Sequence, residues 1–414
     1  MWQLLKIPAK FGEGFNRQTS FDWPMTIIAG RENGVVGYKD AWNLLETYPR
    51  TAIAVLDQAS HLFMVVAHKR RKGMKNRLGS EQRSERTLPR ITIVAVGGTI
   101  AGKATHATQT TQYDPGVVSV NSLIEAVPQI RSLADVSGYQ AANIPSFALT
   151  TDVLLQLGAE VNERLASDSC DGIVITHGTD TLEETAYFLH LTVKSEKPVV
   201  IVGAMRPSTA ISADGPLNLY QAVALAASSE ARGHGVLMSL NGRIGSARDT
   251  SKSQTMTADA FRSAEAGLLG YMVDEQPVLY YKSLRAHTTA TEFDLTEVGN
   301  LPRVDILFGH SDDSRDLVDA AVKAGAKGIV HAGTGNGGIF PLTRVGLVDA
   351  AKAGVVVVSS SRIGNGLVTA KPADTQSGFV SSDNLTPQKA RILLMLALTR
   401  TNDARAIQKM FETY

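Results

Sequence analysis

Two threonines stand directly after glycine turns at the ends of predicted strands. Thr99 follows a Gly-Gly pair and the apolar run 91–96, and Thr179 follows a glycine and the apolar run 172–176. In open parallel sheets, ligands bind beyond the carboxyl ends of the strands, and glycine allows the sharp turn that such a site needs. Thr99 is therefore a candidate nucleophile, although a threonine at this point could instead cap a helix.

A carboxylate accompanies the second threonine. Asp180 comes directly after Thr179 and could hold an ammonium group or orient a base. The alternative is that Asp180 or Thr181 caps the following helix. Glu183 or Glu184 would then stabilise the positive N-terminal end of that helix. Because two strands of one predicted sheet end in Gly-Thr, we favour the functional interpretation.

Short apolar runs rich in Val and Ile alternate with segments of helical period from residue 91 onward. This alternation is typical of a parallel sheet covered by helices on both faces, so we predict an α/β fold. The predicted strands are 91–96, 172–176, 198–202, 235–240, 304–308, 328–331 and 354–359. The predicted helices are 151–167, 181–193, 215–228, 315–324, 343–353 and 387–400.

Two segments divide the chain, because their apolar residues follow neither a helical nor a strand periodicity. Residues 69–90 contain nine Lys or Arg and two Glu, which is typical of a solvated linker, with nucleic-acid contact as the alternative. Residues 281–302 are interpreted as an interdomain connection. The predicted organisation is an extension at 1–65, a basic linker at 66–89, a large catalytic α/β domain at 90–280, the connection at 281–302, and a small C-terminal α/β domain at 303–414.

Composition excludes several classes of protein. The 414 residues are enough for two or three domains at roughly 150 residues each. The 41 basic and 40 acidic residues give a net charge of +1, so no overall field recruits nucleic acid or an anionic membrane. With 43% hydrophobic and 20% charged residues, the chain is neither disordered nor fibrous.

The sequence offers little for a metal or a cofactor. Cys170 is the only cysteine, which excludes an internal disulfide and a cysteine-based zinc or iron-sulfur site. No His/Glu pair has a supported metal-ligand spacing. The glycines of 333–338 have the GxGxxG spacing of a dinucleotide site, but the next predicted strand ends in serines and supplies no acid for a ribose. We therefore expect no cofactor.

The N-terminus lacks the apolar run and the cleavage site of a secretory signal. No apolar run approaches the roughly 20 residues that cross a bilayer. We therefore expect the protein in the cytoplasm.

The first 65 residues have the predicted order strand 25–31, helix 38–48 and strand 52–56. This order resembles the C-terminal end of an α/β-hydrolase, with His61 in the place of the triad histidine and Asn33 where the acid is expected. No GxSxG nucleophile elbow occurs in the chain. We interpret the segment as a fused remnant or a docking element, and His61 is not offered as catalytic.

Several motifs between residue 88 and residue 414 together resemble the bacterial type II L-asparaginases and their glutaminase-asparaginase relatives. The matching stretches are VGGTIAG at 96–102, THGTDT at 176–181, GAMRPST at 203–209, ADGPLNL at 213–219 and NLTPQKAR at 384–391. The resemblance implies a two-domain asparaginase-like fold, with a larger parallel-sheet domain followed by a smaller flavodoxin-like domain.

The resemblance also implies an activity, namely hydrolysis of the side-chain amide of L-asparagine to L-aspartate and ammonia. It implies no metal or organic cofactor, and a homotetramer built as a dimer of intimate dimers. Three alternatives stay open: a glutaminase-asparaginase of broader specificity, the asparaginase-like subunit of a tRNA-dependent amidotransferase, and a binding protein that has lost catalysis.

The resemblance assigns catalytic roles to the residues that occupy the matching positions in this sequence. Thr99 matches the nucleophile of the family, and Tyr113 matches the tyrosine that closes over the substrate. Thr179, Asp180 and Lys252 match a second group in which a hydroxyl, a carboxylate and an ammonium form a hydrogen-bonded relay. Thr179 is also expected at the substrate.

The substrate-binding residues match less completely. Ser146 and Asp180 match residues that hold the α-carboxylate and α-amino groups of the substrate. Phe147 stands where many members have Gln, and Asp312 stands where a neighbouring subunit supplies Asn. The partner's glutamate has no clear counterpart in 365–374. The resemblance therefore leaves the choice between Asn and Gln open.

Overall fold

The computed structural model describes residues 25–30, 52–56, 65–67 and 88–414. The chain forms two compact units, Met1–Glu85 and Arg86–Tyr414.

The described part of the first unit is a three-stranded sheet. β1 (Met25–Gly30) pairs in parallel with β2 (Ala52–Leu56) and antiparallel with β3 (Val65–Ala67). The first two strands were predicted, and β3 was not. The predicted helix at 38–48, Asn33 and His61 lie outside the described residues.

An eight-stranded sheet forms the larger part of the second unit, in the order β13-β12-β9-β8-β7-β6-β4-β5. Its parallel half consists of β4 (Arg90–Gly97), β5 (Asp135–Ile144), β6 (Gly172–Thr176), β7 (Val199–Val202) and β8 (Val236–Leu240). Its antiparallel half consists of β9 (Arg243–Ser246), β12 (Gly270–Val273) and β13 (Gln276–Leu279). The prediction of a parallel sheet is confirmed for the first half, whereas the antiparallel half was not predicted.

The central strands are buried on both faces, which explains their continuous apolar sequences. Every residue of β6, for example, is buried. One face packs against α3 (Thr151–Ala166) and α4 (Leu182–Thr192), and the other packs against α2 (Val120–Ala126) and α5 (Gly215–Ala227).

A second, four-stranded parallel sheet lies in the C-terminal part, with its strands in chain order. They are β14 (Val304–Phe308), β15 (Gly328–Gly333), β16 (Val356–Ser361) and β17 (Val380–Ser381). One face packs against α6 (Asp316–Lys323) and α7 (Pro341–Lys352), and the other against α9 (Pro387–Ala397) and α10 (Ala404–Thr413). The expected small α/β part after the large one is therefore confirmed.

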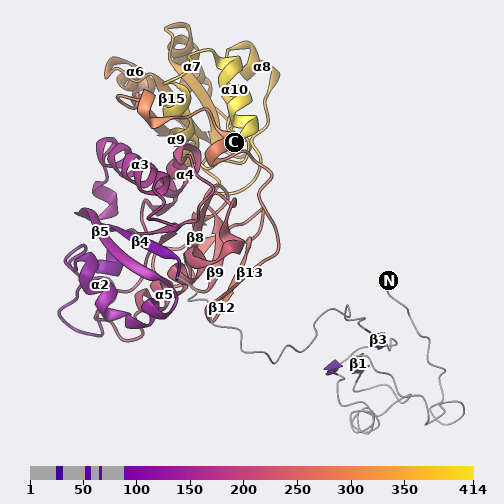
Figure 1. Ribbon diagram of the computed structural model, residues 1–414. Helices are drawn as coiled ribbons and strands as arrows, with labels where there is room; N and C mark the ends of the chain where they lie inside the picture. Colours follow the sequence, from indigo (N-terminus) through magenta and orange to yellow (C-terminus); the bar gives the residue numbers. More distant parts are fainter. Residues whose placement is uncertain (1–24, 31–51, 57–64, 68–87) are drawn as a thin grey trace, which may run out of the picture. The chain divides into compact units, whose positions relative to one another are not determined.

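Helix α9 links the two sheets. It packs against β14 and β15 on one side and against α4 of the larger part on the other, and it lies at their junction in Figure 1. One hydrophobic cluster consequently runs from α3 and α4 through α9 to the C-terminal strands.

The remaining strands and α-helix of the described residues are short. They are β10 (Ser251–Lys252), β11 (Phe261–Arg262) and α8 (Pro372–Gln376). Residues 281–302 contain two 3-10 turns, Thr288–Ala290 and Leu295–Glu297. Among the described helices, none combines the length and the apolar character required to span a bilayer.

Candidate active site

The two Gly-Thr turns lie side by side because their strands are neighbours. β4 and β6 pair in parallel, so both turns leave the carboxyl edge of the sheet together. Thr99 is 6% exposed and Thr179 is 4% exposed. The sheet therefore brings two shielded hydroxyls to the edge where ligands bind in such folds.

Thr99 contacts the phenol that the resemblance pairs with it. The distance from Thr99 Oγ1 to the Tyr113 hydroxyl is 2.6 Å, and either group can be the donor. The loop that carries Tyr113 is closed at its base by two main-chain hydrogen bonds between Lys103 and Asp114. This closure turns the loop back so that Tyr113 faces the nucleophile candidate.

A lysine connects Thr179 with Asp180. Lys252 Nζ donates to Thr179 Oγ1 at 2.9 Å and to Asp180 Oδ1 at 2.7 Å. Because the ammonium has only donors, the Thr179 oxygen accepts here and the hydroxyl proton of Thr179 can point elsewhere. The side chain of Asp180 is 57% exposed, so its carboxylate has room for a further cation.

Ser146 lies against the same turn. Its Oγ accepts the main-chain N–H of Asp180 at 3.2 Å, and its carbonyl accepts the Thr181 hydroxyl at 2.8 Å. Ser146 is 4% exposed, whereas the next residue, Phe147, is 74% exposed. The serine thus belongs to the relay turn, and the phenylalanine ring faces solvent beside it.

Asp312 is held in another part of the fold. It lies in the exposed loop between β14 and α6, where its backbone is left-handed with φ 54°. Within the described ranges, no hydrogen bond joins Asp312 or the Phe147 side chain to the other six residues of the candidate site. The structure therefore brings Thr99 to Tyr113, and Lys252 to Thr179 and Asp180. Asp312 and Phe147 lie outside this network.

Glu183 takes a role that the sequence analysis missed. We considered it only as a charge at a helix start, but it is 4% exposed and its Oε2 accepts the main-chain N–H of Lys252 at 2.8 Å. Its other oxygen accepts the side-chain amide of Gln388. For Gln388, the one signal in the sequence was that residues 384–391 match a motif of the family.

His177 precedes the second Gly-Thr turn and was also missed. Its Nδ1 lies 2.7 Å from the carbonyl oxygen of Gly178, and its Nε2 lies 3.0 Å from the Thr185 hydroxyl. A carbonyl can only accept, so Nδ1 carries the proton and Nε2 accepts from Thr185. Complete burial lowers the pKa of His177 to about 4.

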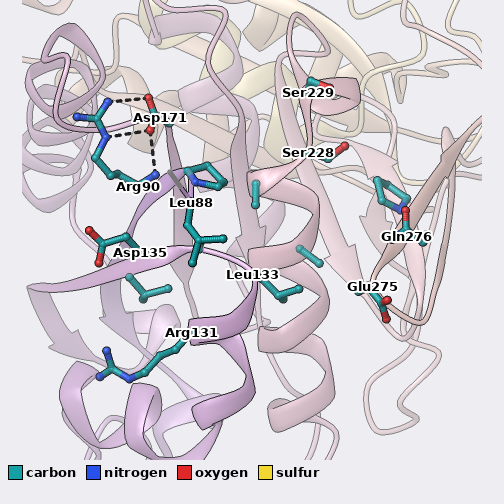
Figure 2. A pocket seen from close by; sticks show the side chains of 16 residues that line it. Leu88, Arg90, Arg131, Leu133, Asp135, Asp171, Ser228, Ser229, Glu275 and Gln276 are labelled. Carbon is teal, nitrogen blue, oxygen red and sulfur yellow. Dashed lines mark hydrogen bonds and ion pairs between the residues drawn. The ribbon is translucent and has the colours of Figure 1, made fainter. Parts of the chain in front are cut away.

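A hollow of about 1390 Å³ lies at the opposite edge of the sheet, and Figure 2 shows side chains that line it. It is lined by Arg90 and Asp135, the first residues of β4 and β5, and Arg90 donates two side-chain hydrogen bonds to Asp171. None of the candidate residues lines it. Because catalytic groups of parallel sheets gather at the carboxyl edge, this amino-edge hollow is not the active site.

A second hollow, of about 1060 Å³, adjoins the relay. Lys252 and Gln388 line it, together with Tyr271, Tyr280 and Tyr281. Neither Thr99 nor Thr179 lines this hollow, so only the lysine side of the relay faces it.

The residues at 333–338 do not form a dinucleotide loop. Thr334 and Gly338 exchange main-chain hydrogen bonds of 3.0 Å and 2.6 Å, so the segment closes on itself before α7 begins at Pro341. For the part of the chain that the structure describes, no group of three His, Cys, Asp or Glu side chains is arranged to hold a metal ion.

Two family models match the second unit. The model described as Asparaginase, N-terminal, matches residues 90–285, and the Glutaminase/Asparaginase C-terminal domain matches residues 303–411.

Individual relatives agree with this result. L-asparaginase 2 of Bacillus subtilis (strain 168) is 52% identical over 346 residues, which cover 83% of this chain and 92% of the relative. The glutaminase-asparaginase of Acinetobacter glutaminasificans is 46% identical, covering 78% of this chain and 99% of the relative.

A crystal structure of a probable cytoplasmic L-asparaginase from Campylobacter jejuni is also similar. It is 48% identical, with a TM-score of 0.77, and the match covers 79% of this chain and 100% of that chain. Its similarity extends the agreement from sequence to fold. With two family models in chain order, and relatives matched over nearly their whole lengths, this chain belongs to the asparaginase family.

Proposed function

We propose that this protein hydrolyses the side-chain amide of L-asparagine to L-aspartate and ammonia. The observation that carries the proposal is the 2.6 Å contact between Thr99 Oγ1 and the Tyr113 hydroxyl. It places a buried, hydrogen-bonded hydroxyl at the carboxyl edge of the sheet, beside the Lys252 relay. Membership of the asparaginase family supports the choice of substrate.

In the proposed reaction, Thr99 Oγ attacks the amide carbon and forms a C–O bond. The C–N bond then breaks, the leaving nitrogen takes up a proton, and ammonia departs from an ester of Thr99. Water attacks this ester and forms a new C–O bond, the bond between the carbonyl carbon and Thr99 Oγ breaks, the Thr99 oxygen takes up a proton from the water, and aspartate leaves. Tyr113 is positioned to take part in the transfer of the Thr99 proton.

The relay acts together with Thr99 in this scheme. Lys252 donates to Thr179 Oγ1, which leaves the Thr179 proton available for donation to the substrate. Asp180 and Ser146 would hold the α-amino and α-carboxylate groups of the substrate. The exposed Asp180 carboxylate suits an ammonium group, because it keeps free acceptor positions beside Lys252.

The test is release of ammonia from free L-asparagine by the purified protein, with Thr99→Ala measured in parallel. We expect activity in the wild type and a loss of turnover by several orders of magnitude in the variant. Activity that appears only with charged tRNA and a partner enzyme would favour the amidotransferase subunit instead.

L-glutamine is the second candidate substrate, because a relative that is 46% identical is named glutaminase-asparaginase. The ratio of kcat/KM for the two amino acids distinguishes the candidates. We expect asparagine to be preferred.

We also propose that the active form is a homotetramer in which Asp312 acts in the site of a neighbouring subunit. Its exposed position outside the hydrogen-bonded network supports this. The test is to mix Thr99→Ala with Asp312→Ala subunits after reversible dissociation. Hybrid sites that combine an intact Thr99 with an intact partner Asp312 should regain activity. A mixture that is no more active than either variant alone would contradict the proposal.

We propose the cytoplasm as the compartment, because the structural relative from Campylobacter jejuni is named a probable cytoplasmic L-asparaginase. Fractionation of cells that express the native chain tests this.

A further inference from the structure

Lys389 is a buried lysine whose partners are main-chain oxygens. It lies on α9, is 1% exposed, and donates from Nζ to the carbonyl of Arg248 at 2.8 Å and to that of Thr250 at 2.7 Å. Burial lowers the pKa of Lys389 to about 8, because removing the ammonium from water disfavours its charged form. These contacts tie α9 to residues 248–250.

The segment that Lys389 holds leads directly to Lys252. β9 ends at Ser246, and the next strand, β10, has two residues that pair only with the two-residue β11. Such a short pair is too small to be stable by itself. The position of Lys252 therefore depends on contacts with the surrounding structure.

A second contact from α9 is linked to Lys252 through Glu183. Gln388 donates to Glu183, and Glu183 accepts the main-chain N–H of Lys252 at 2.8 Å. Consecutive residues of α9 thus hold the chain at two points, at Thr250 through Lys389 and at Lys252 through Glu183.

We propose that Gln388 and Lys389 are positioning residues for Lys252, so that helix α9 sets the geometry of the Thr179–Asp180–Lys252 relay. The proposal rests on the function proposed above, because it assigns the relay a part in turnover. Neither residue has to touch the substrate. Both act by fixing the backbone from which the Lys252 ammonium reaches Thr179.

The chain offers a matched control in Lys197. Its Nζ also donates to two main-chain carbonyls, those of Leu165 and Ser167, both at 2.8 Å. These carbonyls lie at the end of α3 and not in the segment that carries Lys252. Lys197→Met removes the same kind of interaction as Lys389→Met, but in a place that cannot position the relay.

The experiment compares Lys389→Met, Gln388→Met and Lys197→Met in the full-length chain, measuring Tm, kcat and the KM for asparagine. A displaced ammonium should lower kcat on the order of 10- to 100-fold in Lys389→Met, with less effect in Gln388→Met. KM should change by no more than about threefold, because the lost contacts do not bind substrate. Lys389→Arg, which can still donate to both carbonyls, should recover part of kcat.

Crystal structures of the variants provide a second measurement. In Lys389→Met and in Gln388→Met, Lys252 Nζ should move away from Thr179 Oγ1, which it contacts at 2.9 Å in the native chain. The proposal is wrong if Lys389→Met lowers Tm yet keeps kcat, as we expect of Lys197→Met. If Lys389→Met does not fold, an unchanged kcat and an unmoved Lys252 in Gln388→Met overturn it.

Failure of this inference is distinguishable from failure of the proposed function. A wild-type protein that releases no ammonia, or a fully active Thr99→Ala, would contradict the function. A wild-type protein that is active and depends on Thr99, combined with unaffected Gln388 and Lys389 variants, would contradict only the positioning role.

Discussion

The backbone of Gly178 occupies the place where a side chain at Gly98 would begin. A Cβ built on Gly98 would lie 2.1 Å from the Gly178 Cα and 2.3 Å from its nitrogen. Each glycine directly precedes one of the two threonines. The two turns therefore pack backbone against backbone, and this close approach brings the Thr99 group next to the Lys252 relay.

Gly98→Ala should separate the two turns. Gly98 has φ +83°, so alanine would be strained by about 1–3 kcal/mol even without the overlap with Gly178. We expect a lower free energy of unfolding and a loss of most of kcat. Gly354→Ala is the control, because Gly354 has φ +88° but no neighbour within 4 Å of the added carbon. If both variants lose the same stability and both stay active, the packing of the turns does not matter for turnover.

Thr99→Ala and Thr179→Ala should each lower kcat by on the order of 10³-fold or more while the fold is kept, because each removes a reacting hydroxyl from a turn that accepts a methyl group. The double variant should be little worse than the poorer single one, since groups that act as one unit share one reduction of the barrier. Steady-state kinetics and thermal unfolding of all three variants check this. Effects that multiply would show that the two threonines act in separate steps.

Phe147→Gln should strengthen binding of asparagine. Phe147 is 74% exposed beside Ser146 and can donate no side-chain hydrogen bond. A restored hydrogen bond to the substrate is worth about 1 kcal/mol, or roughly a fivefold lower KM. Leu342→Gln, an exchange at a 58% exposed position on α7, is the matched control and should leave KM unchanged. An unchanged KM in Phe147→Gln as well would show that residue 147 does not contact the substrate.

His177 should make the fold less stable in mild acid. Its pKa is about 4 when folded, compared with an ordinary value of 6.5, so between these values the unfolded chain binds a proton that the folded protein does not. Stability is therefore lost as the pH falls from about 6.5 to 4, by up to about 3 kcal/mol.

The measurement is the free energy of unfolding between pH 7 and pH 4. In His177→Gln this pH dependence should be weaker, because the titrating group is gone. His310→Gln is the control, as the His310 side chain is 56% exposed. A slope that is the same in all three proteins would contradict the assignment to His177.

Local sequence determined the central strands and most helices. β6 and β7 are continuous apolar runs because both of their faces are buried, and such runs are recognisable without knowledge of any contact. β5 was not predicted because it lies at the edge of the sheet and mixes exposed, half-buried and polar positions. The four-residue strands β9, β12 and β13 were missed because so short a segment carries no clear period.

The site residues also differ in whether local sequence could predict them. The Gly-Thr turns, with Thr99, Thr179 and Asp180, could be found from sequence because each directly follows a strand of one parallel sheet, and the carboxyl ends of such strands share an edge. Lys252 could be named only through the resemblance. It is 73 residues from Thr179 in sequence and lies in a segment without a period.

Only the tertiary structure decided how Lys252 is held. Glu183 and Gln388 are 205 residues apart, and Lys389 reaches the carbonyl of a residue 139 positions away. Such contacts depend on how α9 packs between α4 and the C-terminal sheet, and no local preference encodes that packing. A buried lysine or glutamate gives no signal in the sequence, because the composition of its own helix does not reveal which distant backbone groups will satisfy its charge.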